Sequence, residues 1–261
     1  MSLSLLLLLS CGWLISGQPH PHKFIFVINQ RGGGTWIMEM LESHPHTYVK
    51  GEILTFIENS ERNKTANQFF NSQECKARTS CAFRIPYNVF IEWNAVGYAI
   101  ARRDISLVLV HRLNKVNHWL SYETTKQLIA RKHSARDAYH CHEGSKCHMD
   151  NETFTVDPVE ALSMMRTLKT KDESISWELT KSPVRWRSFI YEDIMLSGFA
   201  PILSFMGVEE FDAKLSSSLV KRTTRSLCEV INHCDSFISV VKQSPFKWDL
   251  DYCFETMGLH C

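Results

Sequence analysis

The fold is decided by the run Phe24-Ile25-Phe26-Val27-Ile28-Asn29-Gln30-Arg31-Gly32-Gly33-Gly34-Thr35-Trp36. Its first five residues are apolar and either β-branched or aromatic, which is typical of a strand buried on both faces. Three glycines follow at once, and apolar residues then recur at helical spacing until Ser43-His44-Pro45. The run therefore predicts a strand, a glycine loop and a helix, with the loop at the helix N-terminus.

The same pattern returns downstream. Ser106–Val110 is a second buried run, followed by His111-Arg112 and a helix expected through Trp119 and Leu128. Further elements are expected as a weaker strand at 82–85, a helix at 93–101, a helix capped by Asp157 that runs to about 169 or beyond, a strand at 186–191 and a helix from about Glu192. Such alternation predicts an α/β fold, with a P-loop-like parallel sheet flanked by helices.

Composition indicates one globular domain, expected at 18–261, because 261 residues with 44% hydrophobic content suit a single core. Twenty-nine basic residues nearly balance 28 acidic ones, so global charge predicts no nucleic-acid or membrane-surface partner. Any anion site must therefore be local.

The stretch from Arg131 to Asp157 is polar and His-rich and is expected to be an irregular insertion. The sequence leaves the oligomeric state open.

Residues 1–17 resemble a signal peptide, with a leucine-rich run and small residues near Gly17. The run is shorter than the roughly 20 residues that span a bilayer, so no stable membrane span is expected unless the signal is retained as an anchor. The lack of a basic residue near the start leaves that anchor open, and a buried N-terminal helix is the other alternative. The chain is thus expected in the secretory pathway.

Cysteine usage agrees with export. Removing Cys11 from nine cysteines leaves eight, an even number. Neighbour pairing is preferred, although spacing does not fix it: Cys75–Cys81, Cys141–Cys147, Cys228–Cys234 and Cys253–Cys261. Glycosylation sequons stand at Asn63 and Asn151. Zinc binding by the His140–His148 cluster is the alternative to a disulfide there; the spacing matches no standard finger, and no metal is expected.

The glycine loop is suited to bind a phosphate. Glycines let backbone N–H groups approach a ligand, and the helix N-terminus favours negative charge. A plain tight turn is the simpler reading, but the strand before the loop and the helix after it favour the phosphate. The Gly-Lys-Ser/Thr ending of a nucleoside-triphosphate loop is missing, and Arg31 precedes the glycines instead.

These residues resemble the donor loop of the sulfotransferase superfamily, which runs Pro-Lys/Arg-Ser-Gly-Thr/Ser-Thr-Trp. Arg31, Gly33, Thr35 and Trp36 match it, whereas Gln30, Gly32 and Gly34 depart from it. The resemblance continues, in the family's order, through Ser43-His44-Pro45 with Gly51-Glu52, His111 to Ser121, Tyr191-Glu192-Asp193, and Leu219 to Asn232. It is closest to the carbohydrate and bacterial-type branch.

The resemblance implies a sulfotransferase that uses 3′-phosphoadenosine-5′-phosphosulfate (PAPS) and a hydroxyl acceptor, with a glycan as the expected class. It implies Arg31 and Glu52 as catalytic residues, Glu52 being the general base, whose simpler reading is a solvated loop carboxylate. It implies donor binding by the following residues: Gln30, Arg31, Gly32, Gly33, Gly34, Thr35, Trp36, Arg112, Ser121, Lys221 and Arg222. Lys221 and Arg222 could equally form a solvated face. Glu192 and Asp193 are expected to stabilise the fold.

Two other functions stay open. An atypical P-loop kinase would prefer ATP, and the missing Gly-Lys-Ser/Thr counts against it. A non-catalytic secreted module would keep the fold without turnover, which the departures at Gln30, Gly32, Gly34 and Leu113 make plausible, since the family usually has a second basic residue where Leu113 stands.

Overall fold

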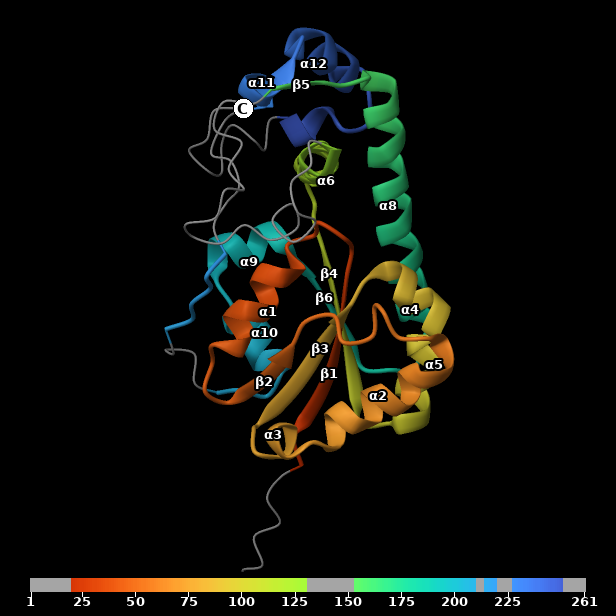
Figure 1. The fold of residues 1–261 in the computed structure, drawn as a ribbon, viewed down its shortest axis with the longest axis vertical. Coiled ribbons are helices and arrows are strands. Elements are labelled where there is room, and N and C mark those ends of the chain that lie inside the picture. Colours follow the sequence, from red (N-terminus) through yellow and green to blue (C-terminus); the bar gives the residue numbers. More distant parts are fainter. Residues whose placement is uncertain (1–19, 131–152, 210–213, 220–226, 251–261) are drawn as a thin grey trace, which may run out of the picture.

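The computed structural model describes residues 20–130, 153–209, 214–219 and 227–250. Its centre is a five-stranded sheet in the order β2 (Thr47–Lys50), β3 (Ser80–Ile85), β1 (His22–Ile28), β4 (Ile105–His111) and β6 (Trp186–Ile190). Every neighbouring pair is parallel, and helices cover both faces (Figure 1). The predicted α/β class is confirmed.

Residues Phe24 to Ile28 of the central strand β1 are all apolar because both faces of the sheet are buried there. Ile25 and Val27 of β1 belong to one hydrophobic cluster, and their neighbours Phe24 and Phe26 belong to the other. This alternation follows from the period of two along a strand. The central position of β1 explains why its whole apolar run is less than 2% exposed.

Two groups of helices cover the faces (Figure 1). One face carries α1 (Gly34–Glu42), α9 (Tyr191–Ser197) and α10 (Ala200–Phe205), whose apolar residues join Phe24 and Phe26. The other face carries α2 (Asn59–Asn71), α3 (Gln73–Lys76), α4 (Tyr87–Trp93), α5 (Ala95–Arg102) and the C-terminal half of α8 (Pro158–Lys181).

A third apolar cluster lies beyond the carboxyl ends of the strands. It joins α6 (Lys115–Ala130), the N-terminal half of α8, α11 (Leu227–Val230) and α12 (Cys234–Lys242). The short strands β5 (Phe154–Thr155) and β7 (Ile231–Asn232) pair in parallel beside them. Trp119 of α6 stacks on Phe237 of α12 with ring centroids 4.9 Å apart. This cluster holds α6 above the edge of the sheet (Figure 1).

Several predicted elements are confirmed and others need correction. The Asp157 cap is confirmed, since its carboxylate accepts hydrogen bonds from the N–H groups of Val159 and Glu160, and α8 continues to Lys181. The helix expected at 93–101 was wrong in its bounds, because Asn94 adopts a left-handed conformation that separates α4 from α5. The end of the expected irregular insertion contains β5, and the edge strand β2 was missed.

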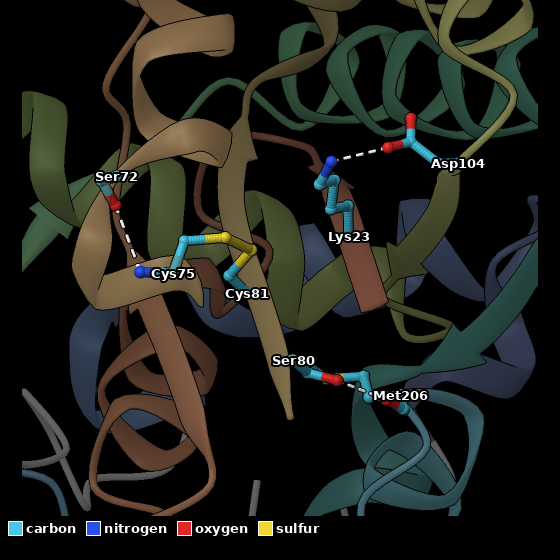
Figure 2. Close-up of a disulfide and its surroundings, with 7 residues drawn as sticks. All are labelled: Lys23, Ser72, Cys75, Ser80, Cys81, Asp104 and Met206. Atoms are coloured by element: carbon cyan, nitrogen blue, oxygen red, sulfur yellow. Dashed lines mark hydrogen bonds and ion pairs between the residues drawn. A yellow bond between two sulfur atoms is a disulfide. The ribbon is translucent and has the colours of Figure 1, made fainter. Parts of the chain in front are cut away.

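The amino edge of the sheet is fixed by polar contacts and a disulfide (Figure 2). Cys75 is joined to Cys81, which ties α3 to β3. Lys23 pairs with Asp104 at 2.6 Å, and the Ser80 hydroxyl donates to the Met206 carbonyl. Cys228 is joined to Cys234 near β7. Both pairs agree with the neighbour pairing preferred from the sequence.

Several predictions fall outside the described residues: the signal segment 1–17, Lys221, Arg222, Asn151, and the pairs Cys141–Cys147 and Cys253–Cys261. Asn63 lies within α2, where its amide oxygen accepts a hydrogen bond from the Trp93 indole at 2.8 Å. In the part of the chain that the structure describes, no helix has both the length and the apolar character needed to cross a bilayer.

Candidate functional site

The candidate site lies at the carboxyl edge of the sheet, where β1 and β4 end side by side. The chain leaves β1 toward β2 on one side of the sheet, and it leaves β4 toward β6 on the other side. A crevice forms where neighbouring strands continue in opposite directions, and this is where open α/β sheets bind ligands. The glycine loop follows β1 at this point.

Gly33 is the residue on which the shape of the loop depends. Its φ of +83° lies in the left-handed region, which costs little only for glycine. A Cβ there would stand 2.0 Å from Cε2 of Tyr191, so the Tyr191 ring closes directly on the loop backbone. Arg31 also has a positive φ, 61°, an uncommon backbone state for a side-chain-bearing residue and one that clusters at functional sites.

Two contacts join this loop to α6. The Arg31 Nε donates to the Ser121 hydroxyl at 3.3 Å, across 90 residues of sequence. His118, one turn earlier on α6, lies with its Nε2 2.8 Å from the Gln30 carbonyl oxygen. The structure thus brings together the loop and the second segment that the sequence had singled out.

His118 is a buried neutral donor. Desolvation, reinforced by the nearby Arg112 cation, lowers its pKa from 6.5 to about 3, although the Gln30 carbonyl acts in the opposite direction. A neutral ring places its one proton on a single nitrogen, and the Gln30 carbonyl requires that nitrogen to be Nε2. Nδ1 is buried and has no hydrogen-bond partner among the described residues. His118 was not predicted as a site residue, because a single histidine within a helix does not by itself indicate a functional site.

The low pKa of His118 predicts an acid-sensitive fold. Between pH 6.5 and about 3 the unfolded chain binds a proton at this histidine that the folded chain excludes. Stability should therefore fall with decreasing pH across this window, by at most about 1.4 kcal/mol per pH unit from this group. Urea unfolding of His118→Gln at pH 7, 6 and 5 should show a flatter slope than wild type. His20→Gln, at an exposed histidine, should keep the wild-type slope; equal slopes for all three proteins would contradict the prediction.

Arg112 stands directly after β4 and is mostly buried, with a side chain 12% exposed. Its guanidinium lies 4.9 Å from the centre of the Tyr191 ring and 3.7 Å, through Nε, from the Glu192 carboxylate. Because Tyr191 also packs against Gly33, Arg112 is coupled to the glycine loop through one ring. Glu192 and Asp193 are expected from the sequence to stabilise the fold, and Glu192 does accept the N–H groups of Leu113 and Asn114.

Arg84 is a second site residue, after His118, that sequence reasoning missed. It comes from the end of β3, its side chain is 13% exposed, and its guanidinium pairs with the Glu52 carboxylate. Its Nη1 lies 3.3 Å from the Thr35 hydroxyl. A Cβ on Gly34 would stand 2.1 Å from Nη1, so Gly34 makes room for this arginine. Burial lowers the pKa of Arg84 to about 10, and the group stays charged at neutral pH.

Glu52, the expected base, lies in the loop after β2 and is held on both oxygens. One oxygen accepts a hydrogen bond from the Arg84 guanidinium, and the other accepts a hydrogen bond from the Thr55 hydroxyl at 2.8 Å. The Glu52 side chain is 28% exposed and has two partners. It is therefore not a freely solvated loop carboxylate, the simpler alternative considered from the sequence, and it is not an isolated base either.

The site therefore combines three guanidinium groups, from Arg31, Arg84 and Arg112, with the backbone of a glycine loop. Guanidinium groups bind phosphate and sulfate oxygens through paired donors. Nε of Arg84 and Nε of Arg112 are buried without hydrogen-bond partners among the described residues, a condition that an anion could relieve. No group of three potential metal ligands occurs in the described parts of the chain.

Comparisons with known proteins give distant structural neighbours. No family model and no curated protein matches the chain. Its fold is similar to a sulfotransferase from Alicyclobacillus acidocaldarius, at 12% identity over 88% of this chain and 93% of that chain, with a TM-score of 0.48. It is also similar to the sulfotransferase domain of the curacin biosynthetic pathway, at 14% identity over 80% and 82% of the chains, with a TM-score of 0.45. Likeness at this level assigns no activity, which has to come from the residues of the site.

Proposed function

We propose that the protein is a sulfotransferase that moves a sulfuryl group from PAPS to a hydroxyl. The observation that carries the proposal is the 3.3 Å contact between Arg31 and Ser121. It joins the glycine loop after β1 to the segment after β4, and a donor with phosphates at both its 5′ and 3′ positions needs two such anion sites close together.

The residues present fit that donor. The backbone N–H groups of the loop suit the 5′-phosphosulfate as neutral donors at a helix N-terminus. The Arg31 guanidinium suits it as a cation with several donors. Arg112 and Ser121 suit the 3′-phosphate. Thr35 and Trp36 lie in the first turn of α1, which begins at Gly34. Trp36 packs edge-on against Tyr191 with ring centroids 5.9 Å apart. PAPS supplies the activated sulfuryl group.

Transfer forms a bond between the acceptor oxygen and sulfur and breaks the bond from sulfur to the 5′-phosphate oxygen. The chain's part is to hold the reactants in line and to stabilise negative charge on the leaving phosphate. Arg31 takes the second role. Glu52 accepts the proton of the acceptor hydroxyl, and Arg84 and Thr55 fix the direction of its carboxylate.

The acceptor class is a glycan hydroxyl, and the compartment is the Golgi lumen or the outside of the cell. The match of Arg31 and Gly51-Glu52 to the carbohydrate branch supports the acceptor class. The pairs Cys75–Cys81 and Cys228–Cys234 support an oxidising compartment.

A secreted binding module without turnover is the second candidate, and the Arg84–Glu52 pair is the observation that favours it. An opposite charge in contact makes a carboxylate a weaker base. Such a module would bind the nucleotide or a glycan and transfer nothing.

Adenosine 3′,5′-bisphosphate, the product of the donor, should raise the melting temperature more than ATP does. At about 1,000 times its Kd a ligand adds roughly 4 kcal/mol to the free energy of unfolding.

Labelled sulfate should pass from PAPS to members of a glycan and small-alcohol panel. Arg31→Ala should reduce this turnover by about 100- to 1,000-fold, the effect of losing one group that stabilises transition-state charge, and Glu52→Ala should reduce it as well.

Lys64→Ala provides the control, because this lysine on α2 has a side chain 68% exposed and contacts only Glu61 among the ion pairs of the described residues. It should keep wild-type turnover. Binding of the bisphosphate without transfer to any acceptor would select the binding module, and preference for ATP would select a kinase. If neither nucleotide stabilises the protein, the donor site is refuted.

A further inference from the structure

The first residue of α6 is a buried lysine with a buried partner. Lys115 is 6% exposed and Asp172, from the middle of α8, is 7% exposed. Their charged atoms, Nζ and Oδ2, lie 2.6 Å apart. The same Nζ also donates to the backbone carbonyl of Arg112. The long helix α8 is thereby connected through one side chain to Arg112, the residue directly after β4.

A buried ion pair is weak evidence for a role in stability. Removing two charges from water costs several kcal/mol for each ion, and apolar residues of similar volume are often as stable. Nor is Lys115 needed to cap α6. The Asn114 amide oxygen accepts the Asn117 N–H at 2.7 Å, and the Asp249 carboxylate accepts the Lys115 N–H at 2.6 Å. The contact to the Arg112 carbonyl therefore calls for another explanation.

The four-residue turn from Arg112 to Lys115 is held by carboxylates from three separate elements. Glu192, at the start of α9, accepts the N–H of Leu113 at 2.9 Å and that of Asn114 at 3.3 Å. The carboxylate of Asp249, after α12, accepts a hydrogen bond from the Lys115 N–H. Asp172 acts through the Lys115 side chain, which donates to the backbone carbonyl of Arg112. Glu192 also lies near Arg112, but beside its guanidinium and not its backbone.

This turn sets the position of the Arg112 guanidinium. The side chain lies over the Tyr191 ring and near Glu192, and its Nη1 donates to the Asn117 carbonyl at 3.4 Å. A side chain with several torsions reaches a fixed point only if its backbone is fixed, and groups that bind a phosphate tolerate little displacement.

We infer that Lys115 and Asp172 are a positioning pair that makes the site distinguish nucleotides with a 3′-phosphate from nucleotides without one. The inference rests on the proposed function, in which Arg112 binds the 3′-phosphate. Neither residue touches the ligand. Lys115 holds the Arg112 carbonyl, Asp172 holds Lys115, and the guanidinium is thereby kept where the phosphate is bound.

The test compares two probes, adenosine 3′,5′-bisphosphate and adenosine 5′-monophosphate, by calorimetry on the full chain. The double variant Lys115→Met/Asp172→Leu replaces the pair by apolar residues, which avoids leaving one charge buried alone. Its affinity for the bisphosphate should fall about tenfold, the worth of one hydrogen bond to a charged group, while its affinity for the monophosphate stays within about twofold. A general loss of structure would weaken both ligands alike.

The chain offers a matched control. Arg62 has a side chain 7% exposed, pairs with Glu92 at 3.2 Å, and donates through Nε to the Ile57 carbonyl at 3.0 Å. Like Lys115, Arg62 is a buried cation that contacts a carboxylate and a backbone carbonyl, on the side of the sheet covered by α2 and α4, although its partner Glu92 has a side chain 56% exposed. Arg62→Met/Glu92→Leu should leave the ratio of the two affinities as in wild type.

The outcomes separate the inference from the function it rests on. A wild-type protein that binds the two probes equally would refute the 3′-phosphate site and the inference with it. A wild-type protein that prefers the bisphosphate, together with a folded Lys115→Met/Asp172→Leu variant that keeps the full preference, would overturn the inference alone. A reduced preference in that variant and an unchanged one in the Arg62 control would establish it.

Discussion

Gly33→Ala is expected to weaken binding of adenosine 3′,5′-bisphosphate by about 100-fold or more. The new Cβ would stand 2.0 Å from the Tyr191 ring, and an added methyl group in a packed site costs about 1–3 kcal/mol. A φ of +83° adds about 1 kcal/mol or more for alanine. The ring cannot yield without consequence, because it carries the Arg112 guanidinium on its face. One methyl group should thus disturb both proposed phosphate contacts.

Gly198→Ala is the control variant. It introduces the same kind of backbone strain as Gly33→Ala but does not displace the Tyr191 ring. Gly198 has a φ of +80°, and nothing lies within 4 Å of the position of an added Cβ. It should lower the melting temperature of the free protein as Gly33→Ala does, yet leave the Kd for the bisphosphate unchanged. The reading of the loop would be wrong if Gly33→Ala bound the ligand as tightly as wild type, or if both variants lost binding equally.

The sequence predicted the sheet and the loop because both depend on local patterns. β1 and β4 are apolar over most of their length, and the glycines between Arg31 and Thr35 occupy one unbroken run. The edge strand β2 was missed for the corresponding reason. Its sequence, Thr47-Tyr48-Val49-Lys50, mixes polar and apolar residues and is only four residues long.

The sequence alone could not predict which residues of distant segments pair with one another. Lys115 and Asp172 are separated by 57 residues, and each reads alone as an ordinary helical charge. Arg84 did leave a signal, since it is the one charged residue of the buried strand Ser80–Ile85. A charge in such a strand must find a partner, yet only the structure identifies Glu52. Gly34, which stands where the family's donor loop has Thr or Ser, is explained by the Arg84 side chain beside it.

This explanation predicts that the effects of changing Gly34 and Arg84 are not additive. Gly34→Ser should weaken bisphosphate binding strongly, because the new Cβ would meet the Arg84 guanidinium at 2.1 Å. Arg84→Ala alone should also weaken it, since Thr35 and Glu52 lose the cation that holds them. In Gly34→Ser/Arg84→Ala the obstruction is gone. The double variant should therefore bind the ligand more tightly than Gly34→Ser, with a coupling of about 1–3 kcal/mol.

The measurement is the Kd of wild type, both single variants and the double variant, from one set of calorimetric titrations. Gly34→Ser combined with Lys64→Ala serves as the control, because Lys64 is exposed on α2 and should give no recovery. Effects that simply add would mean that Arg84 and the loop act independently. Turnover of the double variant then tests Glu52 separately. If the carboxylate needs Arg84 for its direction, binding recovers while sulfate transfer does not, because the introduced serine hydroxyl cannot replace a guanidinium that pairs with Glu52.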